Sequence, residues 1–191
     1  LKDSKLIQNI LIILVPKKSS KKFRKSYNSI SKLLSRYFAG LVLQISILFI
    51  IYTILLLIIG IPNAIVIAFL CSLLNLIPFI GPFIGGILMI LLTMTSHISM
   101  DFSSVILPKT IYVFIGFGIG QLIDNFFSQP FIFSNSVKSH PLEIFLVIIS
   151  GGLLFGAIGM IAAVPTYTAL KVISKEFFSE NRIVKELTKN L

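Results

Sequence analysis

Charged residues and cysteine are scarce in this sequence, and each shortage excludes a class of protein. Only 13% of the 191 residues are charged, whereas 55% are hydrophobic. A soluble domain of this length carries about 25% charged residues. Tryptophan is absent and Cys71 is the single cysteine, which excludes an intrachain disulfide and a cysteine-based metal cluster. The composition is that of a helical integral membrane protein.

Charge is almost missing from the middle of the chain. No lysine or arginine occurs between Tyr37 and Pro108, and Asp101 is the only acid there. Ten of the 17 lysine and arginine residues lie in residues 1–36. No nucleic-acid reader motif accompanies the net charge of +10, so we expect no nucleic-acid partner. The basic residues instead indicate a cytoplasmic side facing anionic lipid.

Motifs of intramembrane enzymes are missing as well. His97 and His140 are the only histidines and lie far apart in the sequence, and no HExxH zinc motif occurs. Neither a pair of aspartates nor a Ser/His dyad suggests a protease. The sequence therefore predicts no enzymatic activity, no cofactor and no metal site.

Apolar runs long enough to cross a bilayer fill most of the chain. The predicted fold is an all-α polytopic bundle with broken or re-entrant helices in the bacterial cytoplasmic membrane. Since the chain begins at Leu1 without a signal peptide, we expect earlier spans to precede it. The predicted domains are an amphipathic basic segment at 1–36, a membrane domain at 37–178 and a charged tail at 179–191.

The basic segment has one apolar and one basic stripe at helical spacing. It predicts a helix that either lies on the membrane surface or packs on a neighbouring helix. After it, Tyr37–Gly60 and Ser104–Ser128 are long enough for full spans. Two shorter apolar segments lie between these spans, at 62–77 and 83–96.

Two apolar segments contain residues that end helices. Such backbone is tolerated at membrane depth only in a protected environment, and paired interrupted segments indicate a transporter's binding region. Plain helix packing at glycines four residues apart is the alternative. We expect a helix–turn–helix at Leu73–Gly86 and a break within Ser150–Pro165. The candidate break residues are Asn75, Pro78, Gly81, Pro82, Gly151, Gly152, Gly156, Gly159 and Pro165.

One face of the span at Ser104–Ser128 is polar near its end, because the polar residues there recur at spacings of three and four. An ionisable residue inside a bilayer usually faces a cavity or a partner. Asp124 therefore either lines a transport pathway or pairs with Lys109 or Lys138 to fix the following loop. The candidate pathway residues are Gln121, Asp124, Asn125 and Gln129.

The loop before the last apolar run is rich in hydrogen-bonding groups, Ser136 and Lys138 among them. We expect it to fold beside the glycines at 151–156. His140 or the preceding serine caps the next helix, with Pro141 in its first turn and Glu143 near its positive end. For His140 and Glu143 we prefer this structural role to a role in transport.

The motifs resemble those of the autoinducer-2 exporter family, the PerM-type permeases. The resemblance covers Arg36 to Glu176 and rests on the Pro-x-x-Gly-Pro turn, the QLIDNFFSQP segment, the His-Pro helix start, the SGGLLFGAIG run and the late Val-Pro. It implies a membrane body of roughly eight helices, about three of them before this region. Members are described as exporters of autoinducer-2, as sodium or lithium/proton antiporters, or as sporulation membrane proteins.

The sequence thus predicts a permease that moves a small polar solute or a monovalent cation, with proton or sodium coupling as an option. A non-transporting membrane scaffold or assembly factor is the alternative. The expected partners are the lipid bilayer and the transported solute or cation, and a homo-oligomer stays open.

Overall fold

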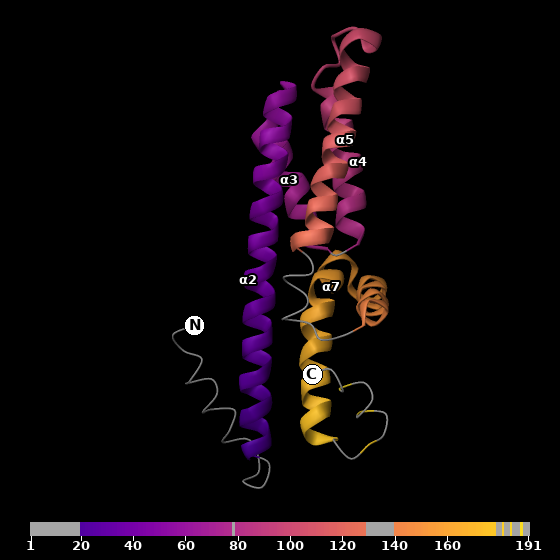
Figure 1. The fold of residues 1–191 in the computed structure, drawn as a ribbon. Helices are drawn as coiled ribbons and strands as arrows, with labels where there is room; N and C mark the ends of the chain where they lie inside the picture. Colours follow the sequence, from indigo (N-terminus) through magenta and orange to yellow (C-terminus); the bar gives the residue numbers. More distant parts are fainter. Residues whose placement is uncertain are drawn as a thin grey trace.

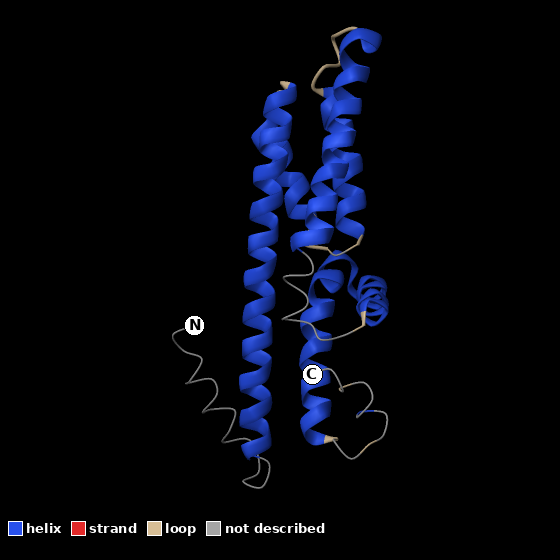
Figure 2. Ribbon diagram, in the orientation of Figure 1, coloured by secondary structure: helices blue, strands red, loops and turns tan. Residues whose placement is uncertain are grey.

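The computed structural model describes residues 20–77, 79–128 and 140–178, together with Asn181, Val184 and Thr188. Every regular element in this part of the chain is a helix (Figure 2), which confirms the predicted all-α class. Three helical stretches are long and apolar enough to cross a membrane: Ser20–Ile59, Phe102–Phe127 and Leu142–Phe177. Two shorter apolar helices, Ala64–Leu74 and Ile80–Thr95, lie between the first two. The chain is therefore an α-helical membrane protein.

Helix α2 (Ser20–Ile59) is the longest helix among the described residues and runs along most of the molecule in Figure 1, where the end of α4 and α5 extends beyond it. Its 40 residues reach about 60 Å, twice the thickness of a hydrocarbon core. Buried side chains recur at steps of three and four along one face, from Tyr37 to Leu56. No helix end falls at residue 36, so the basic residues from Ser20 onward and the first span form one continuous helix. The predicted domain boundary between residues 36 and 37 stays a prediction.

The end of α2 follows from three residues. Gly60 has a φ of 74°, and its N–H donates to the Leu57 carbonyl while the Ile61 N–H donates to the Leu56 carbonyl. These two bonds make a Schellman motif, in which a glycine takes the left-handed conformation. Pro62 comes next and cannot continue a helix. The chain therefore turns back sharply into α3.

Helices α3 (Ala64–Leu74) and α4 (Ile80–Thr95) form the expected helix–turn–helix. The turn is short, and Pro78 lies outside the described residues. Gly81 and Pro82 lie in the first turn of α4 rather than in the connection. A Cβ on Gly81 would overlap the Leu74 carbonyl, so the glycine allows the two backbones to approach closely. Packing thus accounts for at least one of the candidate break residues.

The next span is one continuous helical run in three parts. A π-helix η2 (Phe102–Ile106) leads into α5 (Leu107–Ile123), and a second π-helix, η3 (Asp124–Ser128), ends it. Asp101 caps the start, because its carboxylate accepts hydrogen bonds from the N–H and hydroxyl of Ser104, each at 2.8 Å. These bonds hold the pKa of the exposed Asp101 carboxyl below its usual value.

Helix α7 (Pro141–Phe177) is bent into two arms at Gly156, where φ is 63° and ψ is −148°. This is the one position inside α7 with a non-helical backbone. The expected break therefore falls at Gly156, while Gly151, Gly152 and Gly159 lie within the arms. Pro165 also differs from the expectation, since the second arm continues through it. A proline in a helix removes one hydrogen bond but need not end the helix when neighbours support it.

Two hydrophobic clusters share α2 as a common wall. The cluster nearer the C-terminal end of α2 joins α3, α4 and α5, with Leu48, Tyr52 and Leu56 from α2. The other joins Tyr37 and Leu41 to both arms of α7. Figure 1 shows α3, α4 and α5 beside one half of α2 and α7 beside the other. Within the basic segment, Ser26 is buried and Lys25 pairs with Glu176 of α7 at 2.7 Å, which supports packing on a neighbouring helix, one of the two roles considered.

Candidate functional site

Five polar side chains from three helices meet inside the apolar bundle. The Gln44 amide donates to the Asp124 carboxylate at 2.7 Å. The Gln121 amide nitrogen donates to the Tyr52 hydroxyl at 2.7 Å and to the Asn75 side-chain oxygen at 3.2 Å. We call these five residues the polar cluster. Its members come from α2, from the end of α3 and from the run formed by α5 and η3.

The helices place these side chains by simple periodicity. Gln44 and Tyr52 are eight residues apart on α2, with the fully buried Leu48 midway between them, so all three share the inward face. Gln121 and Asp124 are three residues apart and lie on one face of their run. Asn75 directly follows α3, and its amide also donates to the Cys71 carbonyl at 3.0 Å.

Asp124 is fully buried, with 0% of its surface exposed. A carboxylate at such a place is costly unless hydrogen bonds or a countercharge compensate it. The bond from Gln44 supplies one compensation, and hydrogen bonds to charged groups contribute about 1.5–3 kcal/mol. Asp124 also begins the π-helix η3, and π-helical turns occur often at functional sites.

The structure brings together only part of the predicted pathway. Gln121 and Asp124 lie in the polar cluster, and Asn75, which was expected only as a break residue, joins them. Asn125 is exposed, and Gln129 lies outside the described residues. Among the described residues, no group of three or more histidine, cysteine, aspartate or glutamate side chains could hold a metal ion.

Of the two lysines considered as partners of Asp124, Lys109 lies at the other end of α5. Its ammonium donates to the Gly60 carbonyl at 3.0 Å and contacts His97. Fifteen residues of helix separate it from Asp124, which is about 22 Å. Lys138 lies outside the described residues. The pairing of Asp124 with Lys109 is therefore wrong.

The first turn of α7 is built as the capping residues suggest. His140 stands at the N-cap, and its ring nitrogen Nδ1 accepts a hydrogen bond from the Leu142 N–H at 3.2 Å. Pro141 is the first helical residue. Glu143 accepts from the Tyr167 hydroxyl at 2.9 Å and from Lys171 at 3.1 Å. The carboxylate thus fastens the two arms of α7 together. Ser136, like Lys138, lies outside the described residues.

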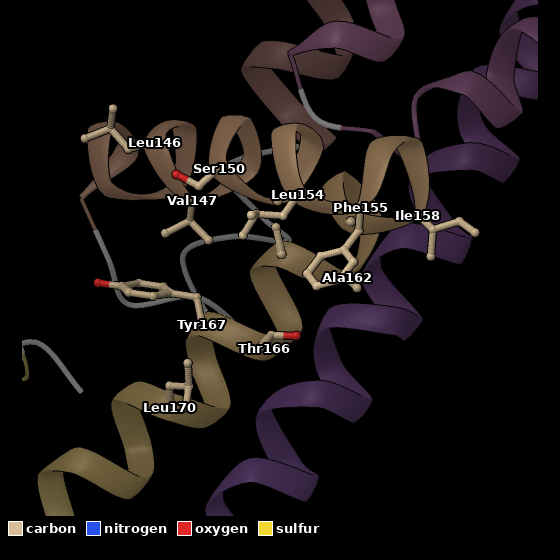
Figure 3. Close-up of a pocket in the computed structure, with 13 residues that line it drawn as sticks. Leu146, Val147, Ser150, Leu154, Phe155, Ile158, Ala162, Thr166, Tyr167 and Leu170 are labelled. Carbon is tan, nitrogen blue, oxygen red and sulfur yellow. The ribbon is translucent and has the colours of Figure 1, made fainter.

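A groove of about 560 Å³ runs between the two arms of α7 (Figure 3). Its wall is apolar apart from a few hydroxyl groups, which include Ser150 and Tyr167. Gly151 and Gly159 also line it, and the backbones cross here so closely that a Cβ on either glycine would overlap the other's carbonyl. No member of the polar cluster lines the groove. The groove and the polar cluster are therefore separate features.

Two members of the polar cluster, Gln44 and Tyr52, escaped the sequence prediction. The signal was present, because both lie in an otherwise apolar span and their spacing of eight puts them on one face. Their partners could not be found from spacing, since Gln44 and Asp124 are 80 residues apart. Only the packing of α2 on α5 and η3 brings them together.

Comparison with known proteins gives a consistent result. A family model described as AI-2E family transporter matches residues 1–179. Two curated proteins of Bacillus subtilis (strain 168) are similar: "Putative transport protein YrrI", 32% identical over 92% of this chain, and "Putative transport protein YueF", 28% identical over 97%. The chain spans about half the length of these relatives, 47% of each. No solved structure matches.

Proposed function

Because the chain belongs to the AI-2E transporter family, we propose that it forms part of a permease that moves a small polar solute or a monovalent cation across the cytoplasmic membrane. The observation that carries the proposal is the fully buried carboxylate of Asp124 among apolar helices. Ionisable residues inside membrane proteins commonly mark substrate and ion pathways.

The chemistry of the polar cluster supports a polar cargo. Its oxygen atoms come from a carboxylate, three side-chain amides and a phenol, which are groups that bind hard cations or the hydroxyl groups of a solute. The Gln121 side-chain oxygen is buried and has no hydrogen-bond partner among the described residues. An acceptor left over in this way suits a cargo that donates hydrogen bonds or carries positive charge.

Each residue then has a defined role. Asp124 holds the charge that a proton or a cation neutralises, and Gln44 orients the carboxylate through its bond to Oδ2. Gln121, three residues before Asp124, and its partner Asn75 provide further amide groups, and Tyr52 accepts a hydrogen bond from the Gln121 amide. Proton coupling follows if protonation of Asp124 alternates with binding of the cargo. Sodium coupling follows if Na⁺ occupies the same oxygen atoms.

The test is flux through proteoliposomes that contain the wild-type chain or Asp124→Asn. The substitution keeps the size and hydrogen-bonding capacity of the side chain but removes its charge. The cargoes tested are Na⁺, Li⁺ and autoinducer-2, with a pH-sensitive dye inside the vesicles to follow protons. We expect the variant to lose most of the flux and its dependence on pH.

Asp101→Asn is the matched control, because it makes the same chemical change at an exposed carboxylate. This variant should transport like the wild type. If Asp124→Asn inserts normally and carries each cargo at the wild-type rate with the same pH dependence, Asp124 is not the coupling residue. If the wild-type chain moves none of the cargoes while remaining folded, the alternative of a non-transporting scaffold or assembly factor is favoured.

A further inference from the structure

The groove between the two arms of α7 has one polar end and an apolar body. Tyr167 and Leu170 line it at the end away from the bend at Gly156 (Figure 3). The Tyr167 hydroxyl donates to Glu143 at 2.9 Å, and Lys171, the residue after Leu170, donates to the same carboxylate at 3.1 Å. From there to the bend the wall is apolar apart from a few hydroxyl groups. The groove therefore matches a ligand with a polar head and an apolar chain.

The depth of the polar end follows from the packing of α7 on α2. In the second arm, Val164 shares a hydrophobic cluster with Tyr37, and farther along the arm Glu176 pairs with Lys25 at 2.7 Å. The arm thus runs antiparallel to α2, and Lys171 lies beside the basic residues that precede Tyr37. The residues between the bend and Val164 extend the other way, along the apolar span of α2. Lysine and tyrosine are typical of the membrane–water interface, so the polar end lies at the level of lipid head groups.

The carboxylate at the polar end has acceptor capacity left over. Both hydrogen bonds, from Tyr167 and Lys171, go to Oε2 of Glu143. Among the described residues, no group donates to Oε1, although a carboxylate offers about four acceptor sites. The Glu143 side chain is 32% exposed, whereas that of Lys171 is only 5% exposed. A head group can therefore reach the negative member of this ion pair but not the positive one.

We propose that the groove binds one phosphatidylethanolamine molecule of the bilayer, with its ammonium on Oε1 of Glu143 and one acyl chain between the arms of α7. The volume of about 560 Å³ lies within the range of sites for small ligands. Leu154, Phe155 and Ile158 in the wall are each at least 73% exposed, so a chain can enter from the side. The site is independent of the cargo carried at the polar cluster.

The head group decides which lipid the groove selects. Lipid tails are as apolar as the wall of the groove, so the acyl chain contributes packing but no preference between lipids. A primary ammonium donates charge-assisted hydrogen bonds to a carboxylate. Phosphatidylcholine has no N–H to donate, and phosphatidylglycerol carries a net negative charge that the Glu143 carboxylate disfavours. Phosphatidylethanolamine is therefore the one of these three lipids that complements the polar end.

The test uses the absence of tryptophan from the sequence, which lets one introduced tryptophan report on lipid at one place. Leu170→Trp puts the reporter at the polar end of the groove. Leu57→Trp is the matched control on α2, because the two leucines are 57% and 58% exposed. The whole chain is placed in phosphatidylcholine nanodiscs with a small fixed fraction of one lipid whose acyl chains are brominated and quench tryptophan on contact. This lipid is phosphatidylethanolamine, phosphatidylglycerol or phosphatidylcholine.

At position 170, the apparent affinity for brominated phosphatidylethanolamine should exceed that for the other two lipids by roughly fivefold, the upper end for one partly exposed ion pair. At position 57, the three lipids should quench equally. Equal quenching by all three lipids at position 170, or a preference for phosphatidylglycerol there, overturns the proposal. Absence of quenching by any lipid at position 170 also overturns it, because protein, such as a second copy of the chain, then covers the groove.

Two further substitutions, each made in the Leu170→Trp chain, separate the head group from the groove. Glu143→Gln keeps an oxygen for Tyr167 and Lys171 but removes the charge, so the preference for phosphatidylethanolamine should disappear. Ala162→Phe fills the groove from an exposed position in its wall and should also remove the preference. Ala39→Phe, the same change at an exposed alanine of α2, should preserve it. With far-UV circular dichroism unchanged, a preference that survives Glu143→Gln or Ala162→Phe contradicts the proposal.

Discussion

The bend in α7 can be tested with two glycine-to-alanine substitutions that differ in one respect. At both Gly156 and Gly118, an added Cβ would meet no atom within 4 Å, so neither substitution creates a clash. Gly118 lies inside α5 with ordinary helical backbone, whereas Gly156 has a φ of 63° and a ψ of −148°. The pair therefore isolates the cost of the backbone conformation itself.

The expected effects have opposite signs. Alanine in a helix interior is favoured over glycine by about 1 kcal/mol, so Gly118→Ala should stabilise the fold by up to that amount. At Gly156 the backbone lies close to a region that is essentially restricted to glycine, and a side chain there costs about 1–3 kcal/mol. The two variants should differ by about 2–4 kcal/mol in the free energy of unfolding. That difference is roughly 30- to 1,000-fold in the unfolding equilibrium constant.

The measurement is equilibrium unfolding in mixed micelles with increasing denaturing detergent. Far-UV circular dichroism is the signal, because the chain has no tryptophan for fluorescence. Both variants are compared with the wild type at one protein-to-detergent ratio. If Gly156→Ala is as stable as Gly118→Ala, the chain does not need glycine at this position and the bend at Gly156 is wrong.

Two further predictions concern contacts outside the bend. Gly159→Ala should destabilise the chain by about 1–3 kcal/mol in the same detergent titration, because its Cβ would overlap the Gly151 carbonyl and force the arms of α7 apart; a stability equal to that of Gly118→Ala would contradict the close crossing. The Asp101 cap should stabilise η2 at every pH above the usual carboxyl pKa. This stabilisation should disappear as the pH falls through the lowered pKa of Asp101. Amide exchange at Ser104 measures this loss, and Asp101→Ala should remove protection at all pH values; a Ser104 amide equally protected in that variant would rule out the cap.

The elements of this fold could be predicted from the sequence because their signals are local. The Gly60-Ile61-Pro62 run predicts the end of α2 by itself, and the paired Pro and Gly residues predict the hairpin of α3 and α4. The position of the bend in α7 was harder to predict, because the interrupted segment at Ser150–Pro165 contains four glycines and a proline. Which glycine takes a positive φ depends on where the two arms can cross, and Gly151 and Gly159 are used for that crossing. Pro165 could not be distinguished from a break by composition.

The site shows the same division between local and distant information. Asp124 and Gln121 stand out because a polar pair in an apolar span is rare and their spacing is local. Their partners on α2 lie 80 and 69 residues away. Lys109 lies in α5 and His97, 12 residues earlier, lies in the turn after α4. Residue spacing thus predicts which side of α5 carries polar groups. The pairing of each polar group with a residue from another part of the chain depends on how the helices pack.

The position of Gln44 on α2 gives the polar cluster its place in the whole molecule. Leu41, one turn before Gln44, packs with Tyr37 and α7, whereas Leu48, one turn after it, packs with α3, α4 and α5. Gln44 therefore lies where the two hydrophobic clusters meet, and its bond to Asp124 ties η3 to α2 at that junction. An amide here interrupts an otherwise continuous apolar face, and burying it is costly unless it is hydrogen-bonded. Leucine at position 44 would extend the apolar face but leave Asp124 without this bond, so the amide is explained by the buried carboxylate and not by the packing of α2.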